Sequence, residues 1–249
     1  MNKIIQPDAQ DLIEEMRTAT SVEDIHSICS RITHRFGFDQ FMYGSRIPTS
    51  FVRPQVIVIS GYDKDWWDHY TSENYMPIDP IVEYSAKNIL PLQWHELDAE
   101  HHSNKRVRRM MNESAEFGLK SGITFPVHTT RGEAALLSFA SNKQPENNAQ
   151  HMQYVAPHLM YFACHLHETV MRIFHTTQDV ESIELTARER ECLLWAAEGK
   201  TSDETADILN ISESTVRFHL NNAARKLNVY SRRHAIARAV CLGLISPVI

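Results

Sequence analysis

The chain has only four cysteines, and they are far apart in its 249 residues. Cys29, Cys164, Cys192 and Cys241 form no CxxC pair. Zinc sites and thiol redox motifs need closely spaced cysteines, and small secreted domains carry a denser disulfide framework. The cysteine pattern therefore favours reduced thiols in a cytoplasm.

Long hydrophobic runs are also missing. No stretch approaches the roughly 20 apolar residues of a membrane-spanning helix, and the start MNKIIQPDAQDLIEEM carries charges throughout, unlike a secretory signal. With eight Gly, ten Pro, 43% hydrophobic and 22% charged residues, the composition is that of a soluble globular protein. We expect a cytoplasmic protein with no membrane partner and with room for two domains.

Catalytic and metal-binding motifs are absent from the sequence. It contains no HExxH, CxxC or GxSxG. Among the fourteen histidines, His101 and His102 are adjacent in a polar stretch, while His165 and His167 point to different faces of an expected helix. We therefore expect no enzyme activity, no metal and no cofactor.

What the first 174 residues do contain is a mixture of helical and extended patterns. Helices are expected at 8–16, 22–36, 63–71, 80–87 and 104–117, and strands at 38–46, 55–60, 123–128 and 133–141. A long helix at 149–174 follows, with apolar residues at steps of three or four: Met152, Val155, Leu159, Phe162, Leu166, Val170 and Ile173. The order predicts an α+β fold, an α-β-α sandwich with an antiparallel sheet. The apolar stripe suits packing on its own domain or against a partner helix.

A polar segment, HTTQDVESIE, separates this part from a helical C-terminal part. We expect domains at 1–174 and 185–249 joined by a linker at 175–184. Thr186 with Glu189, and Thr201 with Glu204, fit capping boxes, and Ser212 and Ser231 suit N-caps. The four predicted helices are 187–198, 202–209, 213–227 and 232–242. Only three residues separate the second from the third, which predicts a helix-turn-helix.

The third of these helices carries side chains that suit DNA. They are Ser214, Thr215, Arg217, Phe218, Asn221, Arg225 and Lys226. Arg can grip a guanine edge and Asn an adenine edge, while Ser, Thr and Lys suit phosphates. Any solvated helix can show such residues, but the three-helix spacing favours DNA binding. The chain's net charge of −6 does not exclude it, because a few cations on one face suffice.

About a dozen positions of this segment also agree with a known pattern at fixed spacing. They are Glu189, Leu193, Gly199, Lys200, Thr201, Ile211, Ser212, Thr215, Val216, His219, Lys226 and Leu227. On these positions the segment resembles the LuxR-type output domain almost end to end. The resemblance implies that the third helix enters the major groove of double-stranded operator DNA, with Arg217, Phe218 and Asn221 at bases. It places Lys200, Thr215 and Arg225 near phosphates, and it implies a homodimer that works with RNA polymerase.

In the N-terminal part, the stretch GYDKDWWDHY sets Tyr62, Trp66 and Tyr70 four residues apart, and Asp79 stands directly before Pro80. Taken alone, the rings suit a core stripe, and Asp79-Pro80 suits a helix N-cap followed by Pro at the first helical position. A pocket for a small molecule with a polar head and an apolar body would use the same residues.

Further positions favour the pocket. Together with Trp94, Gly122 and Ser138, this stretch resembles the autoinducer-binding domain of LuxR-type quorum-sensing receptors. The resemblance implies an N-acyl-homoserine lactone as ligand. The Trp66 indole would then bind the lactone carbonyl and Asp79 would accept the amide N–H. Tyr62 with Ser138 would hold the amide carbonyl.

The acyl tail would lie against Tyr70, Val82 and Trp94, over the modest side chains of Ala134, Leu136, Ser138 and Ala140. Trp67 and Ile81 replace residues that are polar in some relatives, which predicts a drier pocket and leaves tail length and 3-substituent open. Two alternatives also stay open. One is an orphan receptor for a non-lactone or host-derived signal, and the other is a ligand-independent DNA-binding dimer.

Overall fold

The computed structural model of the protein describes residues 9–97, 104–130, 132–145, 148–177 and 183–246. They divide into two compact units, the first made mainly of residues before 178 and the second mainly of residues after it. The predicted His101–His102 stretch lies outside the described residues.

A five-stranded sheet forms the middle of the N-terminal unit, in the order β2-β1-β5-β4-β3. The strands are β1 (Gln40–Ile47), β2 (Gln55–Ser60), β3 (Leu92–Gln93), β4 (Ser121–His128) and β5 (Ala134–Ser141). The pairs β1–β5, β5–β4 and β4–β3 are antiparallel. The first and last strands of the prediction therefore meet at the centre of the sheet.

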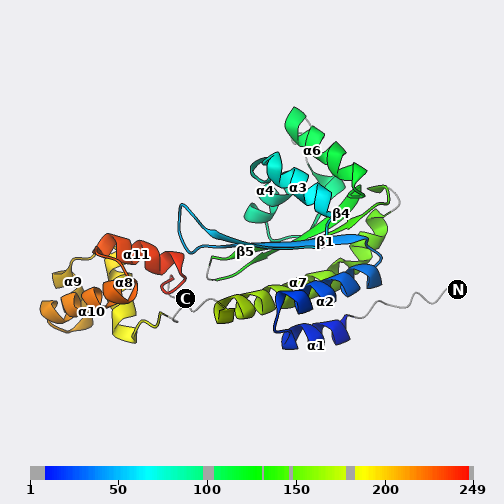
Figure 1. Ribbon diagram of the computed structural model, residues 1–249. Helices are drawn as coiled ribbons and strands as arrows, with labels where there is room; N and C mark the ends of the chain where they lie inside the picture. The colour runs from blue at the N-terminus through cyan, green and yellow to red at the C-terminus, as the bar shows by residue number, and fades with distance from the viewer. Residues whose placement is uncertain (1–8, 98–103, 131, 146–147, 178–182, 247–249) are drawn as a thin grey trace. The chain divides into compact units, whose positions relative to one another are not determined.

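Helices cover both faces of this sheet (Figure 1). On one face lie α3 (Lys64–Ser72), α4 (Pro80–Lys87) and α6 (Lys105–Glu116), with the short 3-10 helices η1 (Met76–Ile78) and η2 (Trp94–Glu96) between them in the chain. On the other lie α1 (Gln10–Thr18), α2 (Val22–Arg35) and α7 (Ala149–Thr177). The predicted α-β-α sandwich is confirmed.

The α7 stripe forms much of the core beneath the sheet. All seven stripe residues are buried, from Met152 to Ile173. The helix continues to Thr177, three residues past the predicted end, because the polar residues after Phe174 do not interrupt it. From β1, Tyr43 reaches this layer and pairs its hydroxyl with His167 Nδ1 at 2.8 Å.

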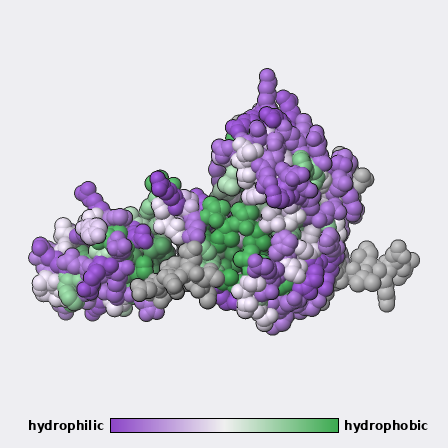
Figure 2. Space-filling view, in the orientation of Figure 1, coloured by the Kyte–Doolittle hydropathy of each residue, from purple (hydrophilic) through white to green (hydrophobic). Residues whose placement is uncertain are grey.

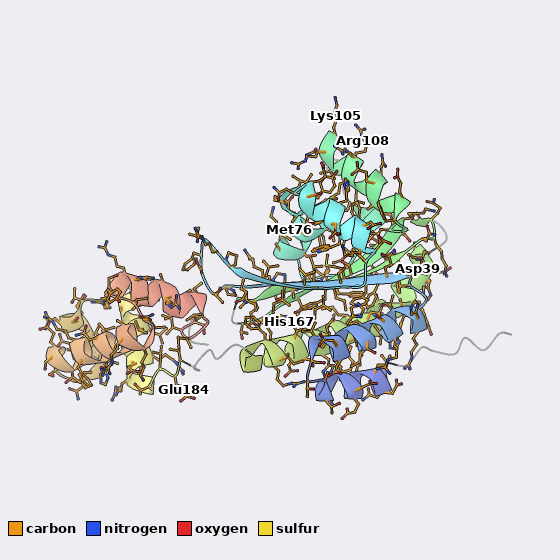
Figure 3. The ribbon with its side chains drawn as sticks, in the orientation of Figure 1. Asp39, Met76, Lys105, Arg108, His167 and Glu184 are labelled. Atoms are coloured by element: carbon orange, nitrogen blue, oxygen red, sulfur yellow. The ribbon has the colours of Figure 1, made fainter. Side chains whose placement is uncertain are left out.

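Side chains alternate between the two faces of a strand. Tyr43 and Ser45 therefore face α7, while Met42, Gly44 and Arg46 face α3 and α4. Figure 3 labels His167 and Met76 on these opposite faces of the sheet.

Strand β3 was not predicted. It has two residues, too few for any periodicity, and it exists because Leu92 and Gln93 pair with Thr124 and Ile123 of β4. Strand β4 also begins two residues earlier than predicted, at Ser121, since that residue pairs with Ser141. In both places a neighbouring strand, and not local sequence, sets the boundary.

The C-terminal unit consists of α8 (Ala187–Ala197), α9 (Ser202–Leu209), α10 (Glu213–Lys226) and α11 (Arg232–Cys241). Both predicted capping boxes form, and Ser212 and Ser231 cap the next two helices. Asn210 takes a left-handed conformation, with φ 54°, between α9 and α10. The predicted helix-turn-helix is confirmed, with each helix boundary within about one residue.

Within the described part of the chain, no helix is long and apolar enough to span a bilayer.

Candidate ligand cavity and nucleic-acid interface

A small cavity of about 40 Å³ lies between the sheet and the α3, α4 and α6 helices. Every N-terminal residue predicted to bind the ligand lines it: Tyr62, Trp66, Tyr70, Asp79, Val82, Trp94 and Ser138. The structure thus brings together residues that are up to 76 positions apart in the sequence.

Asp79 is the ionisable centre of this cavity. Its Oδ1 accepts a hydrogen bond from Ile81 N at 2.8 Å, which caps α4, and its Oδ2 accepts one from Tyr70 Oη at 2.8 Å. Burial raises the pKa of the Asp79 carboxyl above its usual value, although these two donors oppose the rise. The N-cap interpretation and the pocket interpretation of Asp79 are therefore compatible.

A chain of side-chain hydrogen bonds joins two residues that line the cavity, Trp94 and Ser138, through the buried Thr124. Trp94 Nε1 donates to Thr124 Oγ1 at 2.9 Å, and a hydrogen bond of 2.8 Å joins Thr124 Oγ1 to Ser138 Oγ. Tyr62 is also hydrogen-bonded to Ser138. Burial, followed by the nearby Asp79 charge, raises the pKa of Tyr62, so its hydroxyl remains a neutral donor. Hydroxyls and a carboxylate thus meet at one end of an apolar cavity.

The Trp94 ring packs directly against the backbone of Gly122 in strand β4. A Cβ on Gly122 would lie 2.4 Å from the Trp94 ring, closer than side-chain carbons can approach. Only a glycine at this position of β4 lets the indole lie flat on the sheet. The position of the Trp94 ring therefore depends on the absence of a side chain at Gly122.

A second cavity, of about 220 Å³, continues along the sheet from the first. The two share Met42, Trp67, Tyr70, Val82 and Leu136. Beyond them, the second cavity is walled by Gly44, Ser45, Arg46, Val56, Val58, Met76, Ser85, Ala86, Ala134 and Ala135. The combined shape is a polar end followed by a longer apolar end.

The larger cavity lies near exposed apolar surface. Val56 and Met76, on its wall, are 50% and 41% exposed. Figure 2 shows hydrophobic side chains gathered over the strands, between the α3–α4 layer and α7. Trp94, expected beside the tail, lines only the smaller cavity, whereas Tyr70 and Val82 line both.

Helix α6 closes the small cavity through Met110, Met111 and Ser114. It is held by Glu113, which accepts hydrogen bonds from Tyr75 Oη at 2.6 Å and Arg109 Nε at 2.7 Å and pairs with His69 Nε2 at 2.9 Å. Hydrogen bonds from Tyr75, His69 and Arg109 lower the pKa of the Glu113 carboxyl to about 2, and the Tyr75 bond has the largest effect.

Sequence reasoning missed Thr124 and the α6 residues. A signal for Thr124 was present, since it is the polar residue inside the apolar run ITFPV of an expected strand. Its meeting with Ser138 follows from the β4–β5 register, in which the two are direct partners. No local sequence pattern predicts that α6 residues line the cavity.

The C-terminal unit presents α10 as its candidate nucleic-acid surface. Val216, Leu220 and Ala223 of this helix are buried in the four-helix core. The other side exposes Ser214, Arg217, Phe218, Asn221 and Arg225, with Phe218 61% exposed, while Thr215 and, before α9, Lys200 are half-buried. An exposed phenylalanine between an arginine and an asparagine is not explained by the core of this unit.

Two of the predicted DNA contacts have partners within the unit. Arg217 Nη2 pairs with Glu213 at 2.7 Å on the exposed surface, a weak pair that DNA can displace. Lys226 Nζ donates to Glu189 at 2.7 Å and to the Glu184 carbonyl at 2.9 Å. Because the Glu189 side chain is only 4% exposed, Lys226 neutralises a buried charge.

No metal site is evident where the structure describes the chain, since no three His, Cys, Asp or Glu side chains gather in one place there. His167 is buried against Tyr43, and His165 contacts Tyr161 edge-on at 4.6 Å between ring centroids.

Two family models match the sequence along most of its length. The "Autoinducer binding domain" model matches residues 21–170, and the model "Bacterial regulatory proteins, luxR family" matches residues 184–239. The chain belongs to the LuxR family of quorum-sensing transcriptional regulators. It is a ligand-dependent transcriptional regulator with an autoinducer-binding domain and a helix-turn-helix DNA-binding domain.

Curated relatives support this family over nearly the full chain. The transcriptional activator protein AhyR of Aeromonas hydrophila is 35% identical over 242 residues, which cover 95% of this chain and 92% of the relative. The transcriptional activator protein LuxR of Aliivibrio fischeri is 30% identical over 245 residues, 98% of this chain and 97% of the relative.

Solved structures share the LuxR-family fold. A crystal structure of Escherichia coli SdiA has a TM-score of 0.70 at 24% identity, covering 96% of this chain and 98% of that one. SdiA in complex with octanoyl-rac-glycerol has a TM-score of 0.73 at 23% identity, with all of both chains covered. These likenesses agree with the sandwich and helix-turn-helix described above.

Proposed function

We propose that the autoinducer of this regulator is an N-acyl-homoserine lactone, bound in the two joined cavities. The observation that carries the proposal is the buried Asp79 carboxylate, which lines the small cavity beside hydroxyl donors. An acyl-homoserine lactone offers one amide N–H for the carboxylate and carbonyl oxygens for the donors Trp66, Tyr62 and Ser138. A buried polar group without a partner costs about 1–3 kcal/mol, so such a cavity selects for the amide.

The tail of the lactone would extend along Tyr70 and Val82 into the larger cavity, whose walls are mainly apolar. Binding would bury apolar surface and stabilise the folded N-terminal domain by linkage. No cofactor takes part in this proposal, and the protein would act in the cytoplasm, where its operator lies.

The test is thermal melting of the purified full chain against N-acyl-homoserine lactones of graded tail length. A rise of several degrees for a narrow set of tails supports the proposal. Octanoyl-glycerol, the ester ligand held by the SdiA structure, is an informative comparison because it has no amide N–H for Asp79. If octanoyl-glycerol raises the melting temperature and no lactone does, the protein is an orphan receptor instead.

For DNA, we propose that α10 enters the major groove, with Arg217, Phe218 and Asn221 toward bases and Lys200, Ser214, Thr215 and Arg225 toward phosphates. The exposure of Arg217, Phe218 and Asn221 on one helix supports this. In a gel-shift assay, Arg217→Ala should abolish preference for the operator over random DNA, and unchanged preference would contradict the assignment.

A homodimer would set two such helices about 34 Å apart, one turn of DNA. Tyr154 and Tyr161 support dimerisation through α7, since they are 44% and 51% exposed and seven residues apart, on one face of the helix. Sedimentation of wild type and of a Tyr154→Glu, Tyr161→Glu variant tests this. The activator names of the curated relatives support RNA polymerase as the further partner.

A further inference from the structure

The far end of the larger cavity contains a polar group that its apolar walls do not explain. Ser85 of α4 lines this cavity and is only 3% exposed. Its Oγ atom has no hydrogen-bond partner among the described residues. A buried hydroxyl in that condition costs about 1–3 kcal/mol, and serine on a helix could normally bond a carbonyl of its own helix.

Ser85 lies at the opposite end of the cavities from the proposed head-group contacts, because its backbone carbonyl accepts a hydrogen bond from His128 Nε2 at 2.9 Å and His128 of β4 is the direct partner of Ala134. Along β5, the cavity floor runs from Ser138 through Leu136 to Ala134. Four residues of strand span about 13 Å. Ala134 pairs with Arg46 of β1, which also lines this end of the cavity and faces α4 by alternation along the strand. The guanidinium carries only donors, and the serine hydroxyl can donate or accept.

We propose that this end of the cavity recognises an oxygen atom on the outer part of the acyl tail, such as a hydroxyl or a ketone, through Ser85 with Arg46 beside it. The inference rests on the proposed lactone function and specifies its tail. A purely apolar tail would leave the Ser85 hydroxyl buried and unpaired in the bound state as well, whereas an oxygen on the tail satisfies it.

The chain supplies a matched control in Ser45. This serine is also 3% exposed, also lacks a partner for its Oγ among the described residues, and also borders the same cavity. It lies two residues after Tyr43, which reaches His167, so its side chain faces α7 and only its backbone borders the cavity. Ser85→Ala and Ser45→Ala each remove one unpaired buried hydroxyl, so neither is expected to lower the melting temperature.

The experiment measures the affinity of the full-length protein for pairs of N-acyl-homoserine lactones of equal length, one tail ending in a methyl group and the other in a hydroxyl. The quantity compared is the ratio of the two affinities. In the wild type the hydroxyl tail should bind at least as tightly as the methyl tail at the best length. Ser85→Ala should lower the ratio about fivefold or more, the size of one neutral hydrogen bond. Ser45→Ala should leave it unchanged.

The inference is overturned if Ser85→Ala and wild type give the same ratio, or if both serine variants lower it equally. Tight binding of methyl tails with strong rejection of every hydroxyl tail also overturns it, while leaving the lactone proposal intact. Failure of all lactones to bind, with the protein folded, overturns both proposals together.

Discussion

Tyr70 and Asp79 are joined inside the cavity by a 2.8 Å hydrogen bond from the phenol to the carboxylate. The other oxygen of the same carboxylate caps α4. One buried side chain therefore ties α3 to α4 and positions the acceptor that we assign to the ligand amide. Burial and the Asp79 charge raise the pKa of Tyr70, which keeps this phenol protonated as a donor.

Asp79→Asn should weaken lactone binding about tenfold to a hundredfold, since a hydrogen bond to a charged acceptor contributes about 1.5–3 kcal/mol. The unliganded melting temperature should stay equal or rise, because a buried charge is removed. Calorimetric titration and melting measure the two effects. Asp63→Asn is the control, since Asp63 caps α3 in the same way but is exposed and does not line the cavity. Equal loss in both variants would contradict the assignment.

Lactone affinity should increase with pH through the raised pKa of Asp79. In the unliganded protein burial favours the protonated carboxyl, so the stability that this group contributes is present below its unfolded pKa and is lost as pH rises through the folded value. An amide N–H bonds the ionised form, so binding lowers the pKa and releases a proton. Lactone affinity measured at increasing pH, starting from the ordinary aspartate pKa, should rise and then become constant. The affinity of Asp79→Asn should not change with pH. A pH dependence that persists in this variant would mean that another group titrates.

Glu113→Gln should loosen α6 and lower the free energy of unfolding by about 1.5–2 kcal/mol, the low end of the range for a hydrogen bond to a charged group, because the Glu113 side chain is partly exposed. Its pKa is lowered to about 2, so its stabilisation is complete above the unfolded value of 4.5 and is lost as pH falls through about 2. Denaturant unfolding at neutral and at acid pH measures this. The difference from wild type should shrink in acid, and the exposed neighbour Glu116→Gln should show no difference at either pH.

The adjacent residues Arg225 and Lys226 should separate DNA binding from stability. Lys226→Ala leaves the buried Glu189 charge unpaired and should destabilise the C-terminal domain by about 2–3 kcal/mol. Burial alone would raise the pKa of Glu189, but Lys226 and Thr186 hold it below its usual value. Arg225→Ala should keep the melting temperature and lower operator affinity, with a shallower salt dependence. If Lys226→Ala melts like wild type yet loses DNA binding, its role is at phosphate.

The local sequence determined most of the secondary structure. Capping boxes at Thr186 and Thr201 each involve residues three apart, so the helix starts could be predicted without knowing the fold. The α7 stripe and the alternation of β5 are equally local, because the period of each element is set by its own backbone.

Tertiary structure decided what those elements bring together. The Thr124–Ser138 pair depends on strand register, Glu113 joins α6 to residues about 40 positions away, and Lys226 meets Glu189 only after four helices pack. The sequence around Gly122 does not show that the Trp94 ring packs against it, because that contact forms only in the folded chain. Contacts between distant residues have no period in the sequence. The family resemblance could therefore name candidate head-group residues, but only the folded chain places the unpaired Ser85 hydroxyl at the far end of the cavity.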